Sequence, residues 1–296
     1  MGGVSQKWAN VAEMASHGVE FTISTKNFEP IKPGDFGWTT DLTFSYAKTN
    51  ITKLESHSNV ISLVQSSGFP LQGYPHRAVF SIPFVGLDSH GLPQIINENG
   101  EVTNWDINFQ EYQKLDFLKY EGPVDATITG GFGNNLTWKG FMLNIFMTYS
   151  FGNKLRLSPD FSSSYSDMDA MPKEFKNRWV MPGDEAYTDI PAIASLRQVY
   201  INNYIGYGYN AYNYSTARIA DGGFIRLKEV ALTYNIPQSF YRHLRLSSAS
   251  VKLAATNVCL LYADKKLNGA DPEFFNSGGV ASPNPKQFTF TLRFGL

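Results

Sequence analysis

Polar and apolar residues alternate with a period of two along most of the chain. Residues 17–25 place Val19, Phe21 and Ile23 on one face and polar side chains on the other. Side chains of a β-strand point alternately to its two faces, so this pattern predicts a strand. The same alternation recurs in residues 38–46, 141–149, 230–236, 251–255 and 288–294, and a further strand is expected at 127–138. Gly34-Asp35 and Lys139-Gly140 lie where tight hairpin turns would join consecutive strands.

Two architectures produce this alternation: a soluble sandwich and a transmembrane barrel. The predicted strands approach the ~10 residues of a tilted spanning strand, whereas soluble strands average ~5–6. Their polar faces are rich in Thr, Ser and Asn, and connections alternate between very short and very long. The stretch of about 152–216 has no sustained period. These features predict an all-β chain, an antiparallel transmembrane β-barrel segment of about eight strands with long extracellular loops.

Composition narrows the function classes. The 296 residues carry a net charge of −1. This argues against a nucleic-acid-binding protein, which needs a clustered basic face. Aromatic residues make up 15% and charged residues 17%, and the longest apolar run, Val258–Ala263, falls far below the ~18 residues of a spanning helix. The single Cys259 excludes a disulfide scaffold. The first eight residues have no basic region followed by an apolar core, so we expect no signal peptide.

Candidate catalytic groups are scattered. The five histidines have no metal-ligand spacing, and neither H-E-x-x-H nor G-x-S-x-G occurs. We therefore expect no enzyme, metal site or cofactor. Aromatic rings stack on the apolar faces of sugars, and carboxylates accept hydrogen bonds from their hydroxyls, so the long loop could contact a ligand. The aromatic residues suit an interfacial girdle equally well. The candidate contacts are Trp179, Asp184, Tyr204, Tyr207 and Tyr209.

Two motifs carry structural expectations. Arg226 and Lys228 have the same parity as Val230 and Leu232. A basic side chain at the lipid midplane costs ~2–4 kcal/mol, so this end of the strand must lie beyond the hydrocarbon or contain a bulge. Asp271-Pro272-Glu273 is expected to shape a turn, because Pro fixes its own φ and biases the residue before it to an extended conformation.

The residues that carry a family resemblance follow one another along almost the whole chain. The longest matching segment is ADGGFIRLKEVALTYNIP at 220–237. It closely resembles a signature of SusC/RagA-type outer-membrane transporters, the TonB-dependent importers of the Bacteroidetes. Further matches, in family order, are GVEF at 18–21, WTTDLTFSY at 38–46, GLDSHGLP at 86–93, GGFGNN at 130–135, FGN at 151–153, the Arg178-Trp179, Pro182-Gly183-Asp184 and Ile190-Pro191 pattern, Asn257 with GADPE at 269–273, and the closing strand at 285–294.

The resemblance implies uptake of oligosaccharides or peptides across the Gram-negative outer membrane. Such a protein works with a SusD-like surface lipoprotein and is energised by TonB–ExbB–ExbD through a plug domain. A complete member has a signal peptide, a TonB box, a plug and a barrel of ~22 strands. We expect residues 1–296 to be the C-terminal part of the barrel, without those segments, and to reach the outer membrane when joined to the missing N-terminal part. The residues that match family motifs, with expected structural roles, are Asp221, Phe224, Arg226, Leu227, Asp271, Pro272 and Glu273.

Three alternatives to this interpretation remain open. An open sheet in lipid leaves unpaired backbone groups that cost several kcal/mol each, so the sheet must pair with further strands or close on itself. A small self-closed barrel would act as an anchor or adhesin, and its interior would be filled by its own side chains. A soluble glycan-binding sandwich would have to bury the apolar row at 141–149. A non-functional fragment of a truncated transporter gene is the third.

Overall fold

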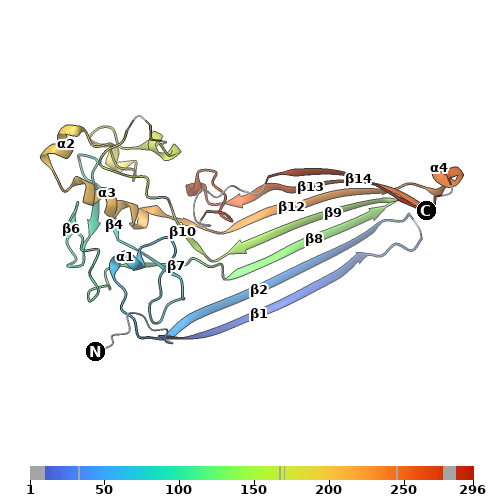
Figure 1. The fold of residues 1–296 in the computed structure, drawn as a ribbon, viewed down its shortest axis with the longest axis horizontal. Coiled ribbons are helices and arrows are strands. Elements are labelled where there is room, and N and C mark those ends of the chain that lie inside the picture. The colour runs from blue at the N-terminus through green and yellow to red at the C-terminus, as the bar shows by residue number, and fades with distance from the viewer. Residues whose placement is uncertain (1–10, 33, 167, 170, 245, 276–284) are drawn as a thin grey trace, which may run out of the picture.

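The main element of the computed structural model is a seven-stranded antiparallel sheet in which every strand pairs with its neighbours in chain order (Figure 1). The structure describes residues 11–32, 34–166, 168–169, 171–244, 246–275 and 285–296. The expectation of no signal peptide therefore falls outside the described residues. The sheet strands are β1 (Ala12–Phe28), β2 (Gly37–Leu54), β8 (Ile128–Trp138), β9 (Phe141–Phe151), β12 (Phe224–Asn235), β13 (Ser248–Ala263) and β14 (Gln287–Gly295).

These strands confirm the sequence-based prediction. All but β8 are longer than their predicted segments, and β8 begins one residue later than the predicted 127–138. The prediction gave about eight strands, and seven form this sheet in the described part of the chain. Lys139 and Gly140 have φ values of 47° and 85°, the left-handed pair that a two-residue type I′ hairpin requires. The turn matches the right-handed twist of β8 and β9, which fixes their register from Trp138–Phe141 onward.

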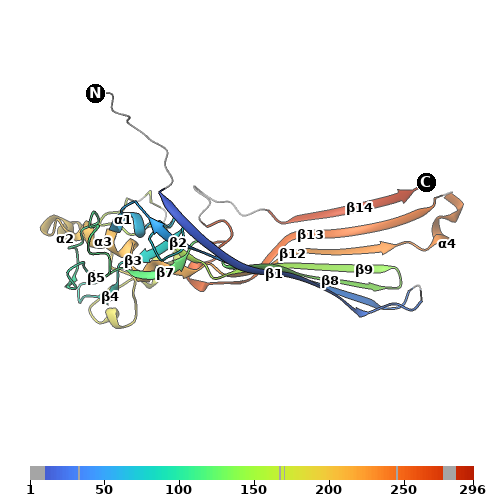
Figure 2. The same ribbon diagram turned by 90° about the horizontal axis from the view of Figure 1, so that it is seen from below.

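The sheet has two different ends (Figures 1 and 2). At one end, which we call the turn end, a two-residue turn joins β8 to β9, and residues 236–247 join β12 to β13. Residues 29–36 join β1 to β2, so Gly34-Asp35 lies within an eight-residue connection and not in the tight hairpin turn that the sequence predicted. At the other end, connections 55–127 and 152–223 fold together with residues 264–275. We call the two long connections the head and residues 264–275 the rim segment. The β12–β13 connection at the turn end holds α4 (Gln238–Tyr241) and η4 (Arg242–Leu244).

The head contains more regular structure than a loop without periodicity would. Three small sheets form there, with strand orders β3-β7, β4-β5-β6 and β10-β11. Within the described residues, the elements of the head and rim segment are α1 (Val60–Leu63), β3 (Ala78–Ser81), β4 (Phe84–Leu87), β5 (Pro93–Ile96), β6 (Val102–Thr103), β7 (Lys119–Pro123), β10 (Lys154–Arg156), η1 (Lys173–Asn177), η2 (Asp184–Ala186), α2 (Leu196–Ile201), α3 (Ile205–Asn213), η3 (Thr216–Arg218), β11 (Ile219–Asp221) and η5 (Lys265–Leu267).

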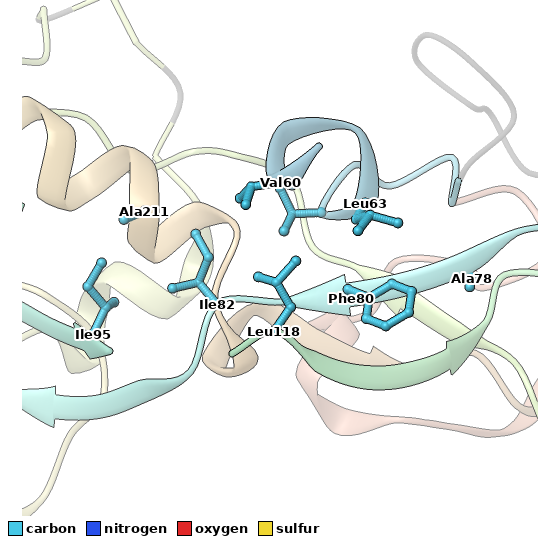
Figure 3. Packing of buried hydrophobic residues seen from close by; sticks show 9 residues of the cluster. Val60, Leu63, Ala78, Phe80, Ile82, Ile95, Leu118 and Ala211 are labelled. Atoms are coloured by element: carbon cyan, nitrogen blue, oxygen red, sulfur yellow. The ribbon is translucent and has the colours of Figure 1, made fainter. Parts of the chain in front are cut away.

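The buried core lies in the head, not beneath the seven-stranded sheet. Its largest cluster draws from α1, β3, β5 and α3 and includes Val60, Phe80 and Ala211 (Figure 3). Ile82 ties the two long connections together, since its N–H donates to the carbonyl of Tyr214 at 3.0 Å. Burial of these apolar side chains stabilises the head at roughly 1.5–3 kcal/mol for each large residue. The head is therefore one packed unit, not separate flexible loops.

Two buried arginines organise the head interior. Arg218 lies 2% exposed, donates from Nη1 to Glu174 Oε1 at 2.6 Å, and packs over the ring of Phe161. Arg156 donates from Nη2 to the carbonyl of Phe80 at 2.6 Å, and burial lowers the pKa of its guanidinium to about 9. Each arginine joins segments far apart in sequence, so the head depends on polar contacts as well as apolar packing.

Candidate functional site

Within the described residues, no segment covers the face of the sheet that carries the alternating apolar residues. The register aligns one row across six strands: Ile23, Leu42, Phe132, Met147, Leu227 and Cys259. We call the face with this row the outer face. Two representative side chains on the outer face, Val19 and Phe290, are 61% and 62% exposed. An apolar face of this extent is far larger than the surface patches of a soluble monomer, and it suits contact with lipid.

Aromatic side chains border the outer face at two levels. Trp138, Phe141 and Tyr234 lie near the turn end, and the Phe141 and Tyr234 rings stack at 4.4 Å. Tyr149 and Tyr262 lie near the head, opposite the same β12 residue, Ile225. Tyr149 follows Phe141 by eight positions on β9, a separation of about 27 Å along the strand. At a tilt of about 40° this covers roughly 21 Å of the membrane normal, near the ~25 Å band of outer-membrane barrels.

The opposite, inner face is mostly polar, with Met142 and Phe146 as apolar exceptions. Ser24 donates to Asp41 Oδ1 at 2.6 Å, and Thr43 accepts a hydrogen bond from the N–H of Gly131 at 2.9 Å. Lys252 lies 3.6 Å from Glu229 on the neighbouring strand. Because the two faces differ so sharply in polarity, the inner face suits a hydrated interior and the outer face an apolar solvent.

A β-bulge on β12 determines which face of the sheet its basic side chains reach. Leu227 pairs with Met147 and Glu229 with Phe146, so Lys228 is an extra residue relative to β9. One extra residue exchanges the two faces of a strand. Leu227 thereby joins the outer face, and Arg226, opposite Thr148, turns to the inner face. The bulge was one of the two solutions that the sequence allowed, and it removes the cost of a cation in lipid.

Arg226 joins two motifs that are 45 residues apart in the chain. Its Nη2 donates to both carboxylate oxygens of Asp271, and its Nε lies 2.9 Å from Glu273 Oε2. Lys228 Nζ lies 3.0 Å from Glu273 Oε1. Arg226 is 5% exposed. The cluster fastens the rim segment to β12, and the N–H of Phe274 donates to the carbonyl of Asp271 at 3.2 Å to close a turn around the buried Pro272.

The remaining motif residues hold local geometry. Asp221 accepts from the N–H of Gly223 at 2.7 Å and pairs with Lys154 Nζ at 2.9 Å. Phe224 begins β12, and its ring lies 5.8 Å from the Arg226 guanidinium. These contacts fix the point where the head passes into the barrel wall.

Two of the candidate ligand contacts use their polar groups within the head. Trp179 Nε1 donates to Glu185 Oε2 at 2.9 Å, which lowers the pKa of that carboxyl. Its ring lies against Gly91, where an added Cβ would approach to 2.5 Å. Asp184 Oδ2 accepts from the N–H groups of Val180 and Met181 at 2.9 and 3.0 Å. Both residues shape the turn that leads into η2.

The three candidate tyrosines divide between core and surface. Tyr209 on α3 is fully buried, its hydroxyl donates to the carbonyl of Ala192, and burial raises its pKa. It is a packing residue, a role that the sequence pattern did not distinguish. Tyr204 and Tyr207 are 51% and 57% exposed. Tyr204 stacks on Trp105 with 4.4 Å between ring centroids, so the surface candidates gain a neighbour that the sequence analysis missed. Trp105 lies in another connection, and no local pattern links it to α3.

Two other kinds of site are absent from the described residues. In the residues covered by the structure, no group of three or more His, Cys, Asp or Glu side chains is arranged to hold a metal ion. None of the helices in this part of the chain combines the length and hydropathy needed to cross a membrane.

The fold and its two faces define a class of protein: the chain is a segment of an antiparallel transmembrane β-barrel with a large head at one end. Comparison with solved structures supports this class. The chain superposes on the structure of the RagAB peptide transporter with a TM-score of 0.69 and 23% identity, covering 96% of this chain and 30% of that one. It matches the RagAB peptide importer in the "open-open" state equally well, over 97% and 29% of the two chains.

Sequence relatives point in the same direction. The chain is 25% identical to TonB-dependent receptor P3 of Formosa agariphila over 92% of its own length, and 24% identical to TonB-dependent receptor P26 of the same organism over 98%. It spans 26% and 30% of these two relatives. No family model matches the sequence. The resemblance to part of a SusC/RagA-type transporter is thus confirmed, and the named relatives are receptors and transporters, not enzymes.

Proposed function

We propose that this chain forms part of the wall and the outer loop region of a TonB-dependent outer-membrane transporter. The named relatives are proteins of this kind. The apolar outer face, its aromatic borders and the polar inner face support a location in the outer membrane of a Gram-negative cell, and the head would then lie on the extracellular side, since tight turns face the periplasm.

The observation that carries the proposal is the direction of the two edge strands. Each of the seven strands is antiparallel to its neighbour, so β1 and β14 run in the same direction. If the described sheet closed on itself, β1 and β14 would pair in parallel. If several copies of the sheet formed one barrel by rotation about its axis, β14 of one copy would likewise pair in parallel with β1 of the next. Antiparallel bacterial barrels have even strand numbers. The sheet therefore requires an odd number of further strands, which favours a larger barrel over a small self-closed anchor.

The proposed cargo is an oligosaccharide or a peptide, and the proposed surface for it is the exposed aromatic group Trp105, Tyr204 and Tyr207. Flat rings at 40–57% exposure offer stacking faces to sugar rings or to peptide side chains. Trp179 and Asp184 would support this surface indirectly, by holding the neighbouring turn. The proposed partners are a SusD-like lipoprotein at the head and TonB–ExbB–ExbD acting through a plug domain; energised import depends on those components.

The proposal is tested by the mass of the native polypeptide in outer-membrane fractions, detected with an antibody against residues 152–216. A membrane species several times larger than 33.1 kDa would support a piece of a complete transporter wall. A heat-modifiable membrane species at 33.1 kDa would contradict it in favour of a small barrel. Absence of the polypeptide from the membrane would leave the fragment alternative.

A further inference from the structure

The turn end of the sheet carries a surface that the proposed transport function does not use. A pocket of about 360 Å³ lies there, between the β1–β2 and β8–β9 turns. We call five of its lining residues the turn-end patch: Ile31, Lys32, Trp138, Lys139 and Phe141. The carboxylate of Asp35 also lines the pocket. The patch combines two ammonium groups with three large apolar side chains, a composition that neither a protein core nor an ordinary solvated turn requires.

Backbone hydrogen bonds hold the two turns side by side. The N–H of Lys139 donates to the carbonyl of Gly34 at 3.1 Å, and the N–H of Asn235 donates to the carbonyl of Gly140 at 2.8 Å. The β1–β2 connection, the β8–β9 turn and the end of β12 are thereby joined along the rim. The lysines in the first two of these segments consequently have fixed backbones, and the pocket between them is part of the fold.

The pocket keeps a net positive charge within the described residues. Neither Lys32 nor Lys139 forms an ion pair there. Glu29 pairs with Lys26 at 2.9 Å. Asp35 Oδ2 accepts the N–H of Lys32 at 2.9 Å, so its single negative charge offsets only one of the two lysine charges. Lys139 Nζ lies 4.8 Å from the Trp138 ring centroid, held beside the outer face instead of over the inner one.

The position of the turn-end patch beside the aromatic border indicates which kind of molecule it can bind. Trp138 and Phe141 belong to the border at the turn end, where aromatic residues meet lipid head groups. The lysines follow immediately, at the level where long basic side chains reach polar head groups while their stems stay on apolar surface. Ile31 is 91% exposed and Trp138 54%, so the patch also offers contact to acyl chains.

We propose that the turn-end patch binds the phosphate of an anionic phospholipid in the leaflet at the turn end, with Lys32 and Lys139 as the cationic groups. This inference rests on the proposed membrane location. The apolar rim favours a lipid over a free anion, because inorganic phosphate gains nothing from Ile31 or Trp138. The bound lipid would fix the height of this rim in the membrane.

Native mass spectrometry of the assembled protein in detergent tests the inference, with phosphatidylglycerol and phosphatidylcholine as probes. We expect phosphatidylglycerol to be retained preferentially. Near a membrane surface each lysine contributes about a five-fold change in affinity for anionic lipid. K32Q and K139Q should therefore each weaken phosphatidylglycerol binding about five-fold, and the double variant on the order of 25-fold. K48Q, an exposed lysine at the opposite end of β2, is the matched control and should change nothing.

Equal retention of the two lipids would overturn the inference, and so would unchanged binding by the double variant. Inorganic phosphate that displaces phosphatidylglycerol at equal concentration would assign the patch to a free anion instead. Heat-modifiable gel migration confirms that each variant is folded. A protein that fractionates with the outer membrane but shows no lipid preference would refute this inference alone, whereas absence from that membrane would refute the proposed function.

Discussion

Removing the Arg226 guanidinium should release the rim segment from the barrel wall. In R226M the side chain keeps an unbranched apolar stem but loses the guanidinium and its contacts with Asp271 and Glu273. Asp271 would then be an unpaired carboxylate with a side chain only 12% exposed. Breaking a buried pair by removing one partner costs roughly 3–5 kcal/mol, because the remaining charge is poorly solvated. Glu273 keeps Lys228, so most of the cost falls on Asp271.

Trypsin cleavage in the rim segment measures this release. Lys265 and Lys266 lie in η5, and Lys266 Nζ donates to the carbonyl of Ile219 at 3.2 Å in the closed state. When closing is faster than cleavage, the cleavage rate follows the population of the open segment. At about 1.36 kcal/mol for each ten-fold change, a cost of about 3–5 kcal/mol means that R226M should be cut roughly 160-fold to 5,000-fold faster.

Two further variants make the comparison decisive. K228M removes only the partly exposed contact with Glu273, which is worth about 0–1 kcal/mol, so its cleavage should rise at most about five-fold. The double variant R226M/D271L replaces the pair with apolar groups and should recover most of the protection. If R226M and K228M are cut at the same rate, or if the double variant is no slower than R226M, the rim segment is not held by the buried pair and the reasoning fails.

Three other predictions follow from the two faces and the head. I145R places a cation on the outer face and should destabilise the folded barrel by about 2–4 kcal/mol in lipid vesicles, whereas N144R on the inner face should change urea unfolding little. G130A brings a Cβ to within 2.2 Å of a main-chain oxygen of β2; it should cost about 1–3 kcal/mol by the same assay, and a neutral result would show that the strands can separate locally. Burial raises the pKa of Tyr209 and Tyr212. The stability of the head should therefore fall as pH rises above about 10, because the unfolded chain loses its phenol protons at a lower pH than the folded head does. Tyrosinate absorbance that appears before tertiary structure is lost would contradict this.

The barrel wall could be predicted from the sequence because each strand separates two different environments. Alternation along β9 or β14 directly reflects apolar contact on one side and polar contact on the other. The sequence also limited β12 to two solutions, a strand end beyond the hydrocarbon or a bulge, since Arg226 on the outer face would have been too costly; the structure has the bulge. The pairing of Arg226 with Asp271 did not follow, because a contact across 45 residues leaves no local period.

The head was predicted least well, for physical reasons that the α3 sequence illustrates. Residues 205–213 read IGYGYNAYN, and two glycines and three tyrosines are poor helix formers. The helix forms because Tyr209 and Tyr212 are buried against residues from distant segments. Tertiary packing overrides local preference here, so neither the helix nor the burial of Tyr209 could be distinguished from an irregular aromatic loop.

The arrangement of connections has a consequence for how the wall assembles. β1–β2 and β8–β9 are joined at one end by connections of only eight and two residues, so each pair can form as a hairpin from local contacts on a microsecond scale. The β2–β8 and β9–β12 pairings, by contrast, bring together strands separated by the whole of residues 55–127 or 152–223. Contacts of such sequence separation form late, because the intervening chain must first be ordered. Folding of the head is therefore expected to set the rate at which the preformed hairpins pair with each other. A variant that slows folding of the head should delay assembly of the wall without changing any strand.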